Sequence, residues 1–98
     1  MTRSELDSAA TTLDPIAIAF YLRVPRSHVV LLQAYFELYD GVATVRTLQG
    51  SDQVVCVLTT QSQRQDCIHV LEAIRGEVHW EIAKEVPHDE LTDKLDTV

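Results

Sequence analysis

The sequence predicts one α+β domain in which two amphipathic helices pack on one face of a four-stranded antiparallel sheet. Two segments carry apolar side chains at helical spacing, and four carry the alternating or continuous apolar pattern of strands. These segments follow one another in the order strand, helix, strand, strand, helix, strand. With 98 residues, of which 46% are apolar, the chain can build one hydrophobic core.

Charge is unevenly distributed along the chain. The formal net charge is −7, and residues 87–98 carry four acidic side chains against one basic side chain. Residues 1–14 carry three acidic side chains against one, so residues 15–86 are nearly neutral. Binding to duplex nucleic acid depends on a basic stripe that neutralises phosphates, and this chain has none. We therefore expect no nucleic-acid partner.

Hydropathy and cysteine usage indicate the compartment. No apolar run reaches the roughly 18 residues that span a bilayer, and the first residues lack the order of a signal peptide. Cys56 and Cys67 lie in apolar stretches without paired-cysteine spacing, which favours reduced core residues. We expect a cytoplasmic protein that makes no membrane contact.

The first half of the chain predicts an arm, a strand and a helix. Residues 1–14 are small and polar and are expected to form a flexible N-terminal arm before the domain of residues 15–86. Apolar side chains alternate over residues 16–24 and predict a strand. Ser27 is expected to cap a helix that Gly41 stops. Its expected buried side comprises Val29, Leu32, Phe36 and Tyr39, with Leu31, Tyr35 and Leu38 beside it.

The second half predicts three more strands and one more helix. Residues 42–48 and 54–60 read as strands joined by a turn, and the apolar run at 54–58 is typical of a central strand covered on both faces. Ser62 and Gln65 form a capping-box pattern that starts the second helix. Residues 78–83 alternate as a fourth strand, and residues 87–98 are expected to form an acidic C-terminal tail.

This element order predicts a specific topology. Each strand–helix–strand half must cross over in the right-handed sense, and a hairpin joins the two middle strands. The result is the ferredoxin-like arrangement, an antiparallel sheet in the order 4-1-3-2 with both helices on one face.

Three segments within residues 16–86 carry a family resemblance: Leu22-Arg23-Val24-Pro25, Tyr39-Asp40-Gly41 and Val45-Arg46-Thr47-Leu48. Through them the chain resembles the ACT-like group of ferredoxin-like domains, and in particular a family of short uncharacterised bacterial proteins. The resemblance implies a small regulatory module that pairs and binds amino acids where the first strand meets the first helix. At that junction, residues 24–28 have the proline of amino-acid-binding members but neither their acidic residue nor their glycine, which argues against the usual ligand.

A candidate ligand site lies at the same junction. The expected fold brings Arg23, Arg26, Ser27 and His28 to the start of the first helix. Unpaired amides and the positive end of the helix dipole suit a carboxylate or phosphate there. The alternative is that these residues are a helix cap with solvated arginines, because arginine side chains are mostly exposed in any protein.

The outer face of the sheet is a candidate interface. The helices cover only one face, which leaves an apolar surface that a lone monomer rarely exposes. Its expected members are Ala17, Ala19, Tyr21, His79 and Glu81. We expect a second copy to cover it and form a homodimer, because twofold pairing is the commonest way for one surface to bury itself. The alternative is that the N-terminal arm or the C-terminal tail folds back over it.

No residue pattern points to catalysis or to a cofactor. The four histidines form no pair at metal-ligand spacing, and neither cysteine has a neighbouring base in the sequence. The three glycines look like turn or cap residues rather than a phosphate-binding loop. We expect a non-enzymatic regulatory or ligand-sensing homodimer without cofactor or metal. The alternative is a protein-protein interaction module with no small-molecule ligand.

Overall fold

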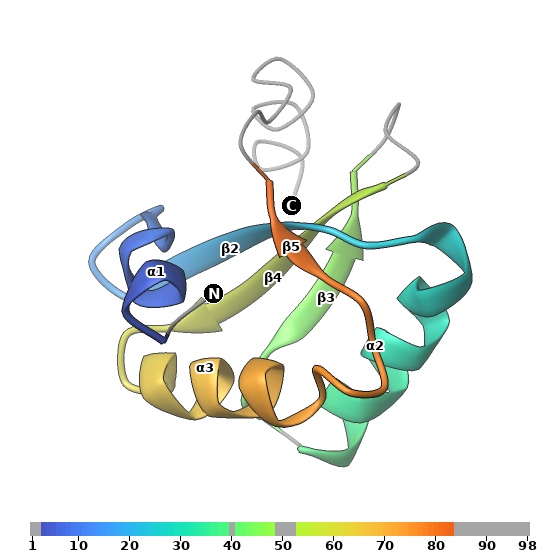
Figure 1. Cartoon of the computed structure of the whole chain (residues 1–98). Helices are drawn as coiled ribbons and strands as arrows, with labels where there is room; N and C mark the ends of the chain where they lie inside the picture. The colour runs from blue at the N-terminus through green and yellow to red at the C-terminus, as the bar shows by residue number, and fades with distance from the viewer. Residues whose placement is uncertain (1–2, 40, 49–52, 84–98) are drawn as a thin grey trace.

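The computed structural model describes residues 3–39, 41–48 and 53–83. These residues form, in chain order, α1 (Arg3–Ser8), β1 (Thr11–Thr12), β2 (Ala17–Arg23), α2 (Arg26–Leu38), β3 (Thr44–Thr47), β4 (Val54–Thr60), α3 (Arg64–Ala73) and β5 (Glu81–Ile82). The predicted α+β class is confirmed. In Figure 1 the helices lie on the viewer's side of the antiparallel sheet, with α2 at the right.

The sheet is built around β2 and β4, which pair antiparallel over their whole length, from Ala17 opposite Thr60 to Arg23 opposite Val54. Strand β3 pairs with the other edge of β4. The remaining edge of β2 is shared, because β1 pairs with its first half and β5 with its last two residues. The order along the sheet is β1-β2-β4-β3, with β5 also beside β2.

The predicted four-stranded sheet in the order 4-1-3-2 therefore needs correction. The described residues form five strands, and the strand predicted over residues 78–83 is reduced to Glu81–Ile82. The physical reason lies in Val78 and Trp80, both of which are buried against the core. Trp80 donates a hydrogen bond from Nε1 to the carbonyl of Leu71 in α3. The chain therefore packs against α3 before it reaches the sheet, and β1 pairs with the rest of the β2 edge.

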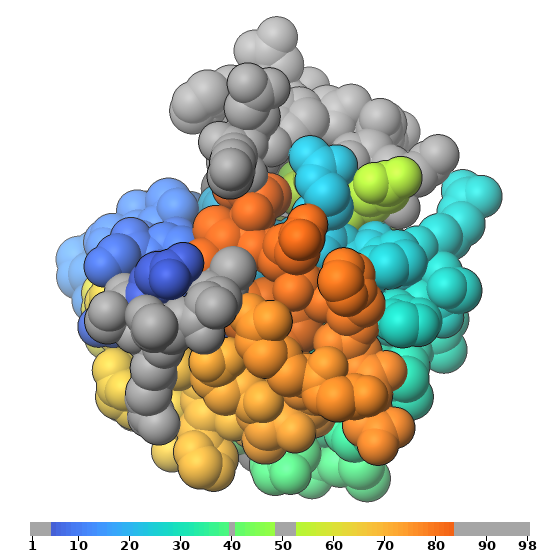
Figure 2. Space-filling view, viewed as in Figure 1, coloured from blue at the N-terminus to red at the C-terminus, as the bar shows by residue number. Residues whose placement is uncertain are grey.

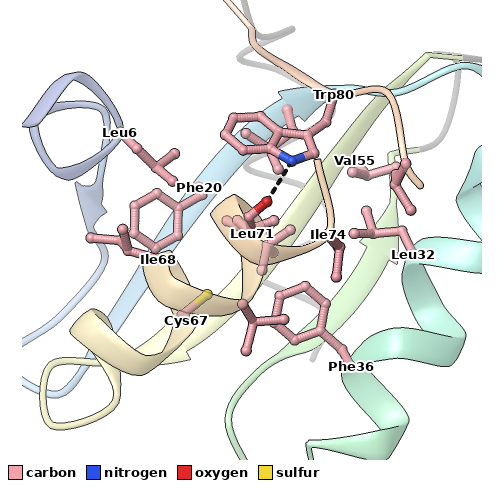
Figure 3. Close-up of a cluster of buried hydrophobic side chains, with 14 of the residues drawn as sticks. Leu6, Phe20, Leu32, Phe36, Val55, Cys67, Ile68, Leu71, Ile74 and Trp80 are labelled. Atoms are coloured by element: carbon pink, nitrogen blue, oxygen red, sulfur yellow. Dashed lines mark hydrogen bonds between the residues drawn. The ribbon is translucent and has the colours of Figure 1, made fainter. Parts of the chain in front are cut away.

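The main core lies between the helices and one face of the sheet. Its strand members alternate along the chain, with Ile18, Phe20 and Leu22 from β2 and Val55 and Val57 from β4. All three helices contribute side chains to this cluster, as Figure 3 shows for Leu6, Leu32, Phe36, Cys67, Ile68 and Leu71. Period-two alternation in β2 thus places one set of side chains under the helices.

A second, smaller cluster lies on the opposite face of the sheet. Its buried members are Ala19, Tyr21, Leu48, Val54 and Cys56. Leu13, Leu58 and Ala83 are half-buried and pack against it. Strand β4 is consequently buried on both faces over residues 54–57, as the continuous apolar run predicts for a central strand.

The segment expected to be a flexible arm is folded onto the core. Residues 3–8 form α1, and Thr11 and Thr12 form β1. Leu6 is fully buried in the main cluster, and the Arg64 guanidinium binds the Asp7 carboxylate. The burial of Leu6, the ion pair and the pairing of β1 with β2 hold the segment on the core. The predicted acidic tail at 87–98 lies outside the described residues.

Both predicted helix caps need correction as well. Ser27 lies inside α2, whose N-cap is Pro25, and no side chain caps the helix. Helix α3 begins at Arg64 and its N-cap is Gln63, so Ser62 is not the N-cap that the capping-box pattern predicts. Thr60 Oγ1 instead accepts a hydrogen bond from the Gln63 amide at 3.3 Å. The glycine stop is confirmed, since Gly41 follows α2 with a φ of 84°, a conformation that favours glycine.

Candidate functional site

The four predicted ligand-binding residues surround the start of α2. Arg23 ends β2, and Arg26, Ser27 and His28 are the first residues of the helix. The Arg23 guanidinium reaches Gln53, with 3.4 Å between Nη1 and Oε1. His28 is half-buried, and its Nδ1 accepts a hydrogen bond of 3.0 Å from the main-chain N–H of His79. His28 therefore links α2 to the segment before β5, while Arg23, Arg26 and Ser27 are exposed.

The five predicted interface residues do not form one exposed surface. Ala19 and Tyr21 are buried within the single chain, and Ala17 is half-buried. His79 and Glu81 are exposed, and Glu81 is the register partner of Arg23. The apolar part of this face is therefore already covered in one chain.

A row of three titratable side chains crosses the outer face of the sheet. In the strand register, Cys56 of β4 lies opposite Tyr21 of β2 on one side and Arg46 of β3 on the other. Burial raises the pKa of the Cys56 thiol, although the Tyr21 hydroxyl and the Arg46 guanidinium both act to lower it. Burial also raises the pKa of Tyr21, and the adjacent Cys56 thiol acts in the same direction. Both groups are therefore neutral near pH 7.

The second thiol is buried on the other side of the sheet. Cys67 of α3 is fully buried in the main core, and burial raises its pKa to about 12. A nucleophilic thiol needs an accessible, electropositive setting that lowers its pKa. Cys67 lies in the opposite kind of environment, so its role in α3 is to pack.

A groove runs along the flank of α2 that faces β3. It has a volume of about 740 Å³, and its lining comes from α2, from the segment that follows it, and from the ends of β2, β3 and β4. Phe36 and Val45 contribute apolar surface, while Gln33 and Glu37 contribute polar groups. None of the four predicted ligand-binding residues lines this groove. The groove therefore lies apart from the start of α2.

The solvent side of α2 carries a row of uncovered apolar side chains. Val30 is 72% exposed, Leu38 is 77% exposed and Leu31 is 38% exposed. Ala34 is exposed between them. We call these four residues, Val30, Leu31, Ala34 and Leu38, the α2 stripe. In Figure 2 α2 forms the right-hand edge of the molecule.

The sequence interpretation missed this surface. It placed Leu31, Leu38 and Tyr39 on or beside the buried side of the helix, whereas all three are exposed. Only Leu32 and Phe36 are buried in α2. One feature of the sequence could have revealed the exposed apolar surface: α2 has only two charged residues, Arg26 and Glu37. A helix covered on one side normally has a polar opposite face, so this composition indicates apolar residues on the solvent side as well.

Within the residues that the structure describes, no three histidine, cysteine, aspartate or glutamate side chains lie close enough together to hold a metal ion. Within the same residues, no helix has the length and apolar character needed to cross a bilayer.

Comparison with known protein families places more than half of the chain in a described domain family. The model of a domain of unknown function, DUF4911, matches residues 22–78. That match contains α2, β3, β4 and α3 and omits α1, β1 and β5. No curated protein sequence and no solved structure gives a significant match.

Proposed function

The chain belongs to DUF4911, a family of domains of unknown function, and we propose that it is a non-enzymatic interaction module that binds another protein chain through the α2 stripe. The whole of α2 lies within the residues that match the family model. The surface therefore belongs to the part of the chain that the family shares.

The observation that carries this proposal is the exposure of Val30 and Leu38, at 72% and 77%. Single exposed apolar residues are normal on protein surfaces. Here, however, Val30, Ala34 and Leu38 follow one another at intervals of one helical turn and form a continuous row. Burying a valine or leucine side chain contributes about 1.5–3 kcal/mol. Binding of a partner that covers the row would be stabilised by this burial, which does not occur in the single chain.

A finer proposal concerns the fold family. We propose that the domain is an ACT-like variant of the ferredoxin-like arrangement, with α1 and β1 as additions to it. Three pairings support this, because β2 lies between β4 and β5 while β3 lies at the outer edge of β4. The two longer helices, α2 and α3, also contribute to the same core cluster.

A ligand-sensing function at Arg23, Arg26, Ser27 and His28 remains a second proposal. The first amides of α2 receive no side-chain cap, which would suit an anion. A thermal-shift series with amino acids, nucleotides and carboxylates tests it, because any ligand that binds the native state raises the melting temperature. A shift that Arg26→Ala abolishes would support this function, and no shift at millimolar concentrations of all three classes would remove it.

Site-specific photo-crosslinking tests the interaction function. Ala34→p-benzoylphenylalanine places a reactive group in the middle of the α2 stripe, and His69→p-benzoylphenylalanine places the same group on the exposed side of α3. In native cells we expect discrete protein adducts from position 34 and none of the same mass from position 69. No adduct from position 34, or identical adducts from both positions, would refute a binding role for the stripe.

A further inference from the structure

We infer that the partner of the α2 stripe is a second copy of this chain, packed so that the two α2 helices run antiparallel about a twofold axis. This inference rests on the proposed function and names its partner. A twofold interface uses the same patch on both copies, so the patch must complement itself in shape and in charge. The α2 stripe and the two charged residues beside it, Arg26 and Glu37, meet both requirements.

Shape complementarity comes from the alternation of large and small side chains along the helix. Val30 and Ala34 are one turn apart on the exposed face. In an antiparallel pair, Val30 of each copy can lie against Ala34 of the other. Close packing is best when a large side chain faces a small one. This register places the twofold axis near Leu32 and brings the two Leu31 side chains together beside it.

Charge complementarity fixes the orientation and the register. Arg26 lies at the beginning of α2 and Glu37 near its end. They are about three turns apart and so lie on the same flank of the helix. In the Val30–Ala34 register, Arg26 of each copy meets Glu37 of the other, twice per dimer. In a parallel arrangement Arg26 of each copy would lie about three turns away from Glu37 of the other, so neither of these contacts could form.

The same register accounts for the most exposed residue of the stripe. Leu38 of each copy lies opposite Arg26 of the other, so the arginine's methylene groups can cover the leucine while the guanidinium meets Glu37. The antiparallel helix dipoles add a small favourable contribution. Together these contacts bury the side chains that the single chain leaves exposed.

The surface is small for a permanent dimer. A standard stable interface buries about 1,600 Å² in total, and one pair of short helices provides less than that. We therefore expect a weak dimer in reversible equilibrium with the monomer.

A charge-exchange experiment on the full chain tests the inference. Sedimentation equilibrium is measured from about 5 µM to 1 mM for the wild type, Arg26→Glu, Glu37→Arg and the double variant. Each single change creates two like-charge contacts and should weaken the dimer at least fivefold, while the double variant should return to near the wild-type constant. Glu77→Arg, on an exposed residue outside α2, has the same charge change as Glu37→Arg and should have no effect.

These substitutions should not destabilise α2. An acidic residue in the first turn and a basic residue in the last turn both interact favourably with the helix dipole. Loss of association in the single variants therefore reports the interface, and circular dichroism should show unchanged helix content.

Three outcomes would overturn the inference. A wild-type chain that stays monomeric at 1 mM would exclude the second copy as partner, and the crosslinks from position 34 would then show separately whether another protein binds there. Single variants that leave the constant unchanged would exclude contact between Arg26 and Glu37. A double variant that remains dissociated would exclude the antiparallel register.

Discussion

The indole Nε1 of Trp80 donates a hydrogen bond of 2.9 Å to the main-chain carbonyl of Leu71, near the end of α3. The last carbonyls of a helix have no partner within the helix, so a side-chain donor satisfies one of them. Trp80 is 1% exposed, and the Arg75 guanidinium lies 4.0 Å from the centre of its ring. Figure 3 shows the indole above α3 with its nitrogen pointing to this carbonyl. The contact joins α3 to the segment that leads into β5.

Replacing Trp80 tests the importance of this contact. We expect Trp80→Phe to lower the free energy of unfolding by about 2–3 kcal/mol, because it removes a buried hydrogen bond and leaves a cavity. Urea titration followed by far-ultraviolet circular dichroism measures the change, since Trp80 is the only tryptophan and its fluorescence is lost. Arg75→Gln is the control, and loss of the cation–π contact together with the exposed ion pair to Glu72 should cost about 1 kcal/mol or less. Equal losses in the two variants would mean that the hydrogen bond contributes little.

The junction between α1 and α3 gives a second prediction. Arg64 binds Asp7 twice, through Nε to the carboxylate at 2.6 Å and through Nη2 to the main-chain carbonyl at 2.8 Å. We expect Arg64→Lys to destabilise α1 locally by about 1 kcal/mol, because lysine cannot reproduce the planar two-point contact and the pair is partly exposed.

Amide hydrogen exchange measures this effect locally. The Ala9 amide bonds to the Glu5 carbonyl at 3.1 Å and reports whether α1 is formed. Its exchange should accelerate about fivefold in Arg64→Lys while the Val57 amide in β4 keeps its rate. Uniform acceleration at both amides would instead indicate a change in global stability.

The difference between local and long-range contacts explains how much of this fold the sequence predicted. The limits of β4 and the stop at Gly41 follow from local patterns, a continuous apolar run and a glycine after a helix, and both were confirmed. The folding of residues 3–12 depends on contacts between positions far apart in the chain, among them Leu6 with the main core and Asp7 with Arg64. No local periodicity contains that information.

The same difference applies to the two candidate surfaces. The sequence could group the residues at the start of α2 as one candidate site because they are neighbours in the chain. The exposure of Leu38 depends on how α2 is rotated over the sheet, and Leu32 and Phe36 set that rotation by packing into the core. Apolar residues lie on several sides of α2, so the sequence alone does not show which side is buried. The packing of the helix on the sheet determines it.

The two thiols give a prediction about pH. The pKa of Cys67 is raised to about 12 and that of Cys56 is raised as well, in both cases because burial disfavours the thiolate. The folded chain therefore holds its thiol protons more tightly than the unfolded chain. The resulting stability is fully present below pH 9, the ordinary thiol pKa, and is lost as the pH rises toward about 12.

Two measurements check this behaviour. Ellman's reagent at pH 8 should leave both cysteines unreacted in the native chain and modify both in urea. The free energy of unfolding should fall between pH 9 and pH 10.5, and it should fall less steeply in Cys67→Ala, which lacks one of the shifted groups. Rapid modification of the native chain, or the same slope in the variant, would contradict the assignment.

The hydroxyl group of Tyr21 gives the last prediction. Tyr21 is 6% exposed, and its Oη is buried without a partner of hydrogen-bond geometry among the described residues. An unsatisfied buried hydroxyl is unfavourable, so its removal costs little. We expect Tyr21→Phe to be as stable as the wild type or more stable by up to about 1 kcal/mol, in contrast to the usual loss on changing a buried residue.

Tyr35→Phe, at a half-buried position on α2, is the matched control and should be nearly neutral. A loss of more than about 1 kcal/mol in Tyr21→Phe alone would show that the hydroxyl has a partner in solution. Since Tyr21 faces Cys56 across the strands, that partner would lie on the outer face of the sheet.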